Sequence, residues 1–184
     1  ASSAQPGLRG LWVDAFGVGL RSPKEVDDVV AAAKKLGVNA IFAQVGKRGD
    51  CYCNRASVPR AEDKDFVAGF DALEDLLTKA HASGIQVHAW MITTAVRSKQ
   101  LKAPKNPKHV WNEHGEDQIG PDNWLIYRQD GTNDAGADYY LDPANPDAAQ
   151  FITEMYTSVV KNYAVDGIML DRVRYPDNNP TPMQ

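Results

Sequence analysis

The segment VDGIMLDRVRYP, residues 165–176, decides the fold, because a short apolar run is followed at once by polar residues. The apolar run, residues 167–170, is typical of a strand buried on both faces, as in the parallel sheets of α/β proteins. In barrels and open α/β sheets, ligands bind at the carboxyl ends of strands. The polar residues that follow are therefore candidates for a functional site: Asp171, Arg172, Arg174 and Tyr175.

Asp171 is the acid of this loop, and two roles are open for it. Its position at the end of a strand favours a catalytic role. Alternatively, Asp171 pairs with Arg172 or Arg174 and only holds the loop in shape.

Three upstream segments carry helix signals. Ser22 is placed as an N-cap, with Pro23 at the first helical position and Glu25 completing a capping box, and Gly37 ends the apolar periodicity. Asp71 and Glu74 repeat this pattern ahead of a second helix that stops at Gly84. A third helix begins at residues 145–147.

Strands are expected near residues 9–16, 39–45, 85–92 and 166–171. They alternate with the helices, which predicts an α/β fold of right-handed βαβ units, with the four strands parallel and adjacent in chain order. Four such strands are half of an eight-stranded TIM barrel, which usually takes about 250 residues. We therefore expect residues 1–184 to be one partial TIM-barrel domain, the N-terminal part of a longer barrel. The alternative is a small open sheet, or one that pairs with a second copy.

Residues 93–144 form a connection much longer than is usual inside a domain, and such loops are more often functional than idle. Its aromatic density predicts a wall of a cleft, the alternative being a loop that packs a small core of its own. The aromatic residues are Trp111, Trp124, Tyr127, Tyr139 and Tyr140. His109, His114, Glu113 and Asp117 fit no common zinc spacing, so neither a metal nor a cofactor is predicted.

Composition excludes some classes of partner. The net charge of −4 argues against a nucleic-acid surface, and no stretch is apolar for the length of a membrane span. The small, polar start at residues 1–7, without an initiator Met, suits a mature protein that has lost a signal peptide, or a trimmed domain. Cys51 and Cys53 lie only two positions apart, so we expect free thiols rather than a mutual disulfide.

Four stretches in order resemble a known family. They are RGLWV at 9–13, NAIFAQV at 39–45 running on to Asp50, Ala80-His81 with VHAW at 87–90, and NYAVDGIMLD at 162–171 with Tyr175-Pro176. This pattern resembles the glycoside-hydrolase-like TIM-barrel family of bacterial cell-envelope proteins, also called GH10-like or DUF187.

The resemblance implies an eight-stranded barrel of which this chain is the first half. It also implies a secreted, periplasmic or cell-envelope glycosidase, since some members cut peptidoglycan glycan strands. The family commonly has a pair of acids before its aromatic-aromatic-Pro ending, and here Arg172 replaces the second acid. Asp171 is left as the acid that inherits the role.

Glycoside hydrolysis needs two carboxyls across the scissile bond. Asp171 is the candidate catalytic residue, and its partner is expected in the strands that would complete the barrel, with Asp14 and Asp50 as alternatives within the chain. The candidate substrate-binding residues are Asp14, Gln44, Arg48, Asp50, His88, Trp90, Arg172, Arg174 and Tyr175. The alternative roles are structural: caps or ion pairs for the acids, and core packing for His88 and Trp90.

The leading hypothesis is a hydrolase of an envelope or extracellular polysaccharide. The rival is a non-catalytic glycan-binding barrel, which the Arg172 replacement favours. Unpaired barrel edges also predict self-association of the 184-residue chain.

Overall fold

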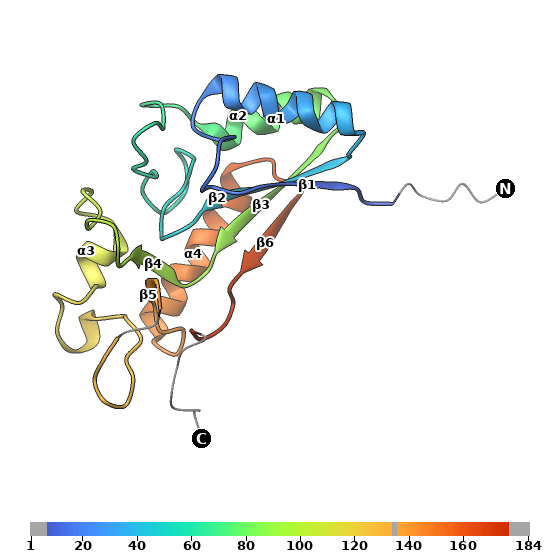
Figure 1. Cartoon of the computed structure of the whole chain (residues 1–184). Coiled ribbons are helices and arrows are strands. Elements are labelled where there is room, and N and C mark those ends of the chain that lie inside the picture. Colours follow the sequence, from blue (N-terminus) through green and yellow to red (C-terminus); the bar gives the residue numbers. More distant parts are fainter. Residues whose placement is uncertain (1–6, 134–135, 177–184) are drawn as a thin grey trace.

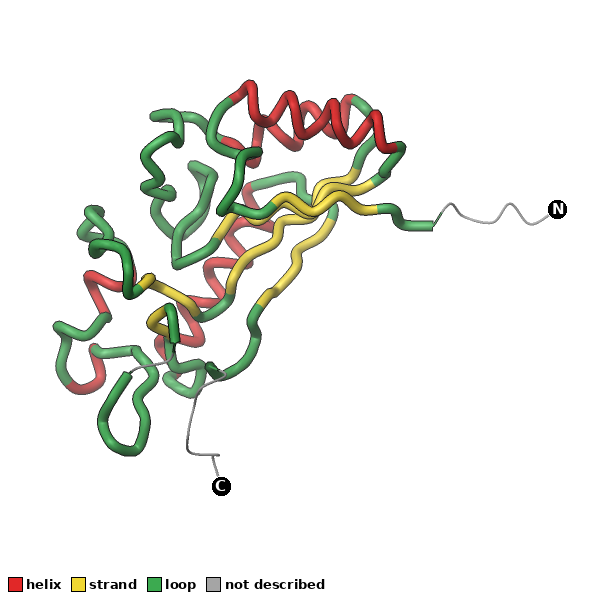
Figure 2. Tube along the Cα trace, viewed as in Figure 1, coloured by secondary structure: helices red, strands yellow, loops and turns green. Residues whose placement is uncertain are grey.

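The computed structural model describes residues 7–133 and 136–176, and its centre is a four-stranded parallel sheet (Figure 1). The strand order is β1 (Gly10–Val13), β2 (Ala40–Gly46), β3 (Gln86–Ile92) and β6 (Gly167–Asp171). Every neighbouring pair is parallel, so the predicted strand order and direction are confirmed. The tube in Figure 2 shows these strands running side by side.

The three long helices begin and end close to the predicted signals. They are α1 (Pro23–Leu36), α2 (Ala72–Ala82) and α4 (Pro146–Asn162), with Ser22, Asp71 and Asn145 as N-caps. Gly37 closes α1 in the left-handed conformation, at φ 67°, as its position predicted. The capping box differs in one detail, because the Glu25 carboxylate reaches back to the Gly19 N–H at 2.6 Å.

All three helices pack against the same face of the sheet. On β3, Val87, Ala89 and Met91 are fully buried in a core that also contains Leu76 of α2 and Met155 of α4. Because alternate residues of a strand point to opposite faces, these three residues of β3 lie on one face, and the helices that pack against them cover that face. A doubly wound fold would carry helices on both faces, so one-sided cover is the arrangement of a barrel segment.

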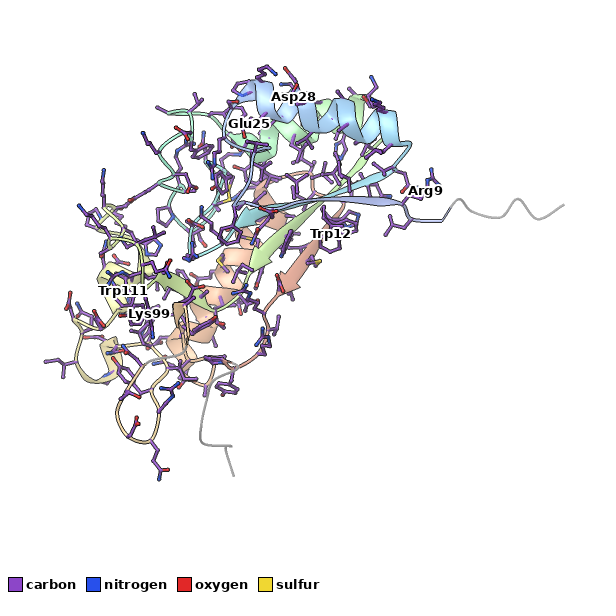
Figure 3. The ribbon with its side chains drawn as sticks, viewed as in Figure 1. Arg9, Trp12, Glu25, Asp28, Lys99 and Trp111 are labelled. Carbon is purple, nitrogen blue, oxygen red and sulfur yellow. A yellow bond between two sulfur atoms is a disulfide. The ribbon has the colours of Figure 1, made fainter. Side chains whose placement is uncertain are left out.

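The opposite face of the sheet carries aromatic rings. Trp12 and Phe42, paired in register, stack with 4.5 Å between ring centroids, and Phe42 stacks on His88 at 4.8 Å. Trp12 is 53% exposed and lies on the side of β1 away from α1 (Figure 3). In a closed barrel this face is the interior.

The long connection after β3 is folded rather than open. It contains β4 (Ala95–Ser98) and β5 (Asp138–Tyr140), which pair antiparallel, together with α3 (Val110–His114) and a 3₁₀ turn, η1 (Gly120–Asp122). These short elements were not predicted, because their pairing joins residues about 40 positions apart in a segment rich in turn residues.

This connection packs a core of its own, built around Val96, Trp111, Leu125 and Leu141. Trp111 is 6% exposed, and Trp124 and Tyr139 pack on the same cluster. The prediction of a cleft wall is therefore wrong for Trp111, Trp124 and Tyr139. Their rings pack in this core instead, and burial of large rings stabilises a long connection.

The prediction of free thiols is also wrong, because Cys51 and Cys53 form a disulfide. Their Cα atoms are 5.0 Å apart, inside the range that a disulfide spans. Cys51 forms backbone hydrogen bonds with Pro59 and Ala61, and Tyr52, between the two cysteines, is buried in the core. These contacts fix the local path of the chain, which the spacing of the cysteines in the sequence does not reveal.

The cap of α1 provides a test of the fold. Ser22 Oγ accepts a hydrogen bond from the Glu25 N–H at 3.2 Å. Replacing Ser22 with Ala should lower the free energy of unfolding by about 1 kcal/mol, whereas Ser22→Asp keeps an acceptor and should cost little. Urea denaturation measures both. The matched control is Ser83→Ala at the exposed end of α2, and an equal loss there would contradict the assigned cap.

Candidate functional site

Asp171 ends β6, and both of its carboxylate oxygens accept a hydrogen bond. The Trp90 Nε1–H donates to Oδ2 at 2.9 Å, and the Arg172 backbone N–H donates to Oδ1 at 2.7 Å. The side chain is partly buried. Within the described residues no Lys or Arg side chain pairs with this carboxylate, and a carboxylate held in a fixed direction by two neutral donors can act on a proton or an electrophile.

The backbone of Asp171 is held as firmly as its side chain. Its carbonyl oxygen accepts from the Thr93 N–H at 3.0 Å and from the Thr93 hydroxyl at 2.7 Å. Tyr156 of α4 donates its hydroxyl to Thr93 Oγ1 at 2.5 Å. Burial raises the pKa of Tyr156 to about 12, and the nearby Asp171 carboxylate adds to this, so the phenol remains a donor at neutral pH.

The Arg172 guanidinium does not pair with Asp171. It lies 3.9 Å from Asp138 Oδ2, while Arg48 Nε donates to Asp138 Oδ1 at 3.0 Å. Asp138 is 6% exposed, so one buried carboxylate bridges two arginines from separate strand ends. Arg172 itself has a φ of 51°, a left-handed conformation that turns the chain away directly after Asp171.

Three predicted site residues use their side chains to hold the backbone. Asp14 Oδ1 accepts from the N–H groups of residues 16 and 17, and Asp50 Oδ1 from those of residues 47 and 48. Gln44 is 1% exposed, and its Oε1 accepts from the Ala15 N–H at 2.8 Å. These contacts fit a structural role for the three side chains, and they use one carboxylate oxygen of each acid and the amide oxygen of Gln44.

Trp90 is brought to Asp171 and also packs edge-on against Trp12, with 5.4 Å between ring centroids. His88 lies further along the same face, stacked on Phe42, and its Nε2 hydrogen-bonds Gln86 Oε1 at 3.0 Å. Arg174 is exposed and Tyr175 is partly buried in the segment that follows β6. The structure thus groups Trp90, Asp171 and Arg172, with Arg48 joined to them through Asp138.

A pocket of about 330 Å³ opens between the loop after β2 and the segment around β4. Arg48, Asp50 and His109 line it, but Asp171 does not. Both walls follow the carboxyl ends of strands, and Figure 3 shows Trp111 and Lys99 at that end of the molecule and Arg9 at the other. The wall segments are fixed together, because the His109 ring hydrogen-bonds the Arg48 carbonyl at 2.8 Å.

A buried ion pair in this pocket was not predicted from the sequence. Lys47, 9% exposed, donates to both carboxylate oxygens of Asp63 at 2.7 and 2.8 Å and to the Tyr52 hydroxyl at 3.0 Å. Burial alone would raise the pKa of Asp63, but the hydrogen bonds from Lys47 and Tyr52 outweigh it and hold the pKa below its usual value. Sixteen residues separate the pair, and the loop between them carries no periodic signal.

Metal ligation has no support in residues 7–133 and 136–176, where no three His, Cys, Asp or Glu side chains gather into a candidate metal site. Burial lowers the pKa of His109. As a neutral ring, it can donate through Nε2 to the Arg48 carbonyl and accept at Nδ1 from the Trp111 N–H at 3.1 Å.

In the same described ranges, no helix is long and apolar enough to cross a bilayer.

One-sided helices, a parallel sheet and an acid at a strand's carboxyl end define an α/β-barrel segment of the kind that carries enzyme active sites. The chain belongs to the family described as glycosyl hydrolase-like 10, whose model matches residues 7–181. The predicted family resemblance is thereby confirmed.

Named relatives agree with this assignment. The glycosyl hydrolase DigH of Escherichia coli K12 is 23% identical over 197 residues, covering 96% of this chain and 44% of DigH, so the chain spans less than half of that relative. A hypothetical protein from Ruminiclostridium thermocellum superposes with a TM-score of 0.62 at 17% identity, over 91% of this chain and 78% of that one. The PgaB (BpsB) glycoside hydrolase domain from Bordetella bronchiseptica gives a TM-score of 0.53 at 21% identity, over 89% and 43%. Both structural matches support the fold.

The packing of His88 provides a second test. A methyl group at Gly167 would overlap the His88 ring. Gly167→Ala should therefore lower the free energy of unfolding by about 1–3 kcal/mol in the wild-type background, and by clearly less in His88→Ala, where the ring is absent. Urea denaturation of the four proteins of this cycle measures the coupling. Equal losses in both backgrounds would show that the ring does not lie over the glycine.

The Lys47–Asp63 pair predicts a pH effect. Because the pKa of Asp63 is lower in the folded than in the unfolded protein, its contribution to stability is present above the unfolded value of about 3.9 and is lost as the pH falls. Asp63→Asn should destabilise by about 1–3 kcal/mol at pH 7, and the difference from wild type should shrink below about pH 4. Thermal unfolding across pH 3–8 tests this, with the exposed Asp65→Asn as control. A pH-independent difference would contradict the assigned shift.

Proposed function

We propose that the protein is a glycoside hydrolase in which the Asp171 carboxylate acts as acid/base or nucleophile. The observation that carries this proposal is the fixed Asp171 carboxylate at the carboxyl end of β6, held by Trp90 and the Arg172 N–H and not paired with any Lys or Arg side chain that the structure describes. Membership of the glycosyl hydrolase-like family supports the reaction class.

The reaction needs a second carboxyl, about 5–9.5 Å from the first according to whether configuration is retained or inverted. Asp138 contacts Arg48 and Arg172, and Asp14 and Asp50 each use one carboxylate oxygen to hold backbone N–H groups. In this proposal the partner of Asp171 comes from further strands of the barrel. DigH, more than twice the length of the matched segment, has room for such strands.

The proposed substrate is a polysaccharide of the bacterial envelope or the extracellular medium, such as the glycan strands of peptidoglycan. Trp90 and Trp12 lie on the face that becomes a barrel interior, and an indole face can stack on the CH surface of a pyranose ring. Arg48 and Arg172 offer donors for sugar hydroxyls from the same end of the sheet.

A secreted, periplasmic or envelope location is part of the proposal. The Cys51–Cys53 disulfide supports it, because disulfides persist in oxidising compartments and are rare in the cytosol. The outer strands of the sheet are β1 and β6. We propose that these edges pair with further strands of the same barrel or, in the isolated 184-residue chain, with a second copy.

A second candidate function is glycan binding without hydrolysis. It is favoured by Arg172, which stands where the family commonly has a second acid and is instead drawn to Asp138. The two functions differ in what Asp171 does, since a binding barrel needs a hydrogen-bond acceptor there and a hydrolase needs an ionisable acid.

Asp171→Asn separates the two candidates. The amide keeps the shape but neither exchanges a proton nor attacks, so release of reducing ends from glycan strands by the full-length protein should fall at least about a hundredfold. The melting temperature and glycan binding should change little. The matched control is Asp166→Asn at the opposite end of β6, where Asp166 pairs with His81 at 2.8 Å; it should lower stability and leave the rate unchanged. An Asp171→Asn protein that keeps more than about a tenth of the rate would remove Asp171 from the reaction.

A further inference from the structure

The pocket between the loop after β2 and the β4 segment is strongly cationic. Seven of its lining residues are Lys or Arg and three are Asp or Glu, in a chain whose net charge is −4. A local excess of positive charge on an acidic protein raises the local concentration of anionic ligands. We call this site the lysine pocket.

The three acids of the lysine pocket are already committed. Asp63 is held by Lys47 and Tyr52, and Asp50 by the N–H groups of the 47–48 turn. Glu62 accepts from the Lys105 and Asn106 N–H groups, each at 2.8 Å, which ties one wall of the pocket to the other. These contacts use both carboxylate oxygens of Asp63 and of Glu62 and one of Asp50, so the acids help to build the pocket and leave a ligand more cations than free carboxylate oxygens to meet.

Several of the cations lack a partner. Among the described residues, the ammonium groups of Lys64, Lys102 and Lys105 make no hydrogen bond or ion pair, and all three side chains are exposed at the rim. The Arg97 guanidinium carbon lies 4.7 Å from the Trp111 ring centroid, one of its terminal nitrogens donates to the Leu101 carbonyl at 3.3 Å, and its buried Nε has no hydrogen-bond partner among the described residues. Its nearest acid is Glu116, at 3.9 Å. A held guanidinium that shares a pocket with exposed, unpaired ammonium groups suits a carboxylate.

The lysine pocket is joined to the site at Asp171. Arg48 lines the pocket and bonds Asp138, whose other oxygen faces Arg172, the residue after Asp171. A volume of about 330 Å³ is in the range of small-molecule sites, and Val96, Leu101 and Pro104 supply apolar surface for a sugar ring.

We propose that the lysine pocket binds a sugar that carries a carboxylate, so that the substrate is an anionic glycan. The assignment of a glycan rests on the proposed function, whereas the preference for a negative charge rests on the pocket itself. The carboxylate meets Arg97 and the rim lysines, and the ring lies against the apolar wall, with the chain continuing towards Asp171.

The test compares two sugars that differ only at C6. Calorimetry with the full-length protein measures binding of a β-1,4-linked glucuronate trimer, of the neutral β-1,4-linked glucose trimer, and of acetate. We expect the glucuronate trimer to bind at least about tenfold more tightly than the glucose trimer at low salt, with a smaller advantage at high salt.

Lys64→Gln, Lys102→Gln and Lys105→Gln combined should remove most of that advantage, about tenfold in affinity, since each exposed pair contributes a modest amount. The matched control is Lys108→Gln, because Lys108 is an exposed lysine of the same loop that does not line the pocket. This variant should bind the glucuronate trimer as much more tightly than the glucose trimer as the wild type does. Circular dichroism checks that the triple variant is folded. If it is not, each single variant is measured, and losses confined to the three rim lysines still support the pocket.

Three results would overturn the inference: equal binding of the charged and neutral trimers, acetate binding as tightly as the glucuronate trimer, or the same loss in Lys108→Gln as in the triple variant. Reducing-end release is measured on the same samples. Hydrolysis without tighter binding of the charged trimer would contradict the proposed ligand of the lysine pocket and would still support the hydrolase proposal. Tighter binding of the charged trimer without hydrolysis of any glycan would support the lysine pocket and contradict the hydrolase proposal.

Discussion

The pairing of β3 with β6 is the constraint on which the site depends. Its register sets Trp90 beside Met169 and Ile92 beside Asp171. With this register, the Trp90 indole N–H reaches the Asp171 carboxylate, and Thr93, one residue past β3, holds the Asp171 carbonyl. A slip by one residue would send Asp171 to the helix-covered face, because side chains alternate along a strand.

The same register explains why one side of the sheet is apolar and the other aromatic. On the helix-covered face, Val87, Ala89 and Met91 are apolar and pack in the same core as residues of α2 and α4. The alternate positions, among them His88 and Trp90, belong to the other face. The buried apolar core therefore lies on one side of the sheet, and the candidate site residues Trp90 and Asp171 lie on the other side or at its carboxyl edge.

The strands and long helices were predictable because their signals are local. Ser22, Asp71 and Asn145 cap helices through bonds to residues two or three positions on, and the apolar runs are short and bounded. The parts that escaped prediction depend on long-range contacts. Arg48 and Asp138 are 90 residues apart, and nothing near Asp138 in the sequence indicates that it contacts both Arg48 and Arg172. The disulfide was missed for a related reason, since the path of the chain around Tyr52 decides it and the spacing of the cysteines does not.

Net charge does not reveal local clusters of charge, since it averages over the whole molecule. A chain of charge −4 gathers cations along one pocket, where the acids that would balance them are occupied by backbone and Lys47 contacts. Arg172 lies close to this group of cations, because it contacts Asp138 as Arg48 of the pocket does. Replacing an acid by Arg beside Asp171 would ordinarily neutralise the remaining carboxylate, but the buried Asp138 draws the guanidinium away, towards Arg48. Asp138, from the long connection, thus contacts both guanidinium groups. Among the described residues, the Asp171 carboxylate accepts hydrogen bonds only from the neutral Trp90 and Arg172 N–H groups, an arrangement compatible with the proposed acid/base or nucleophile role.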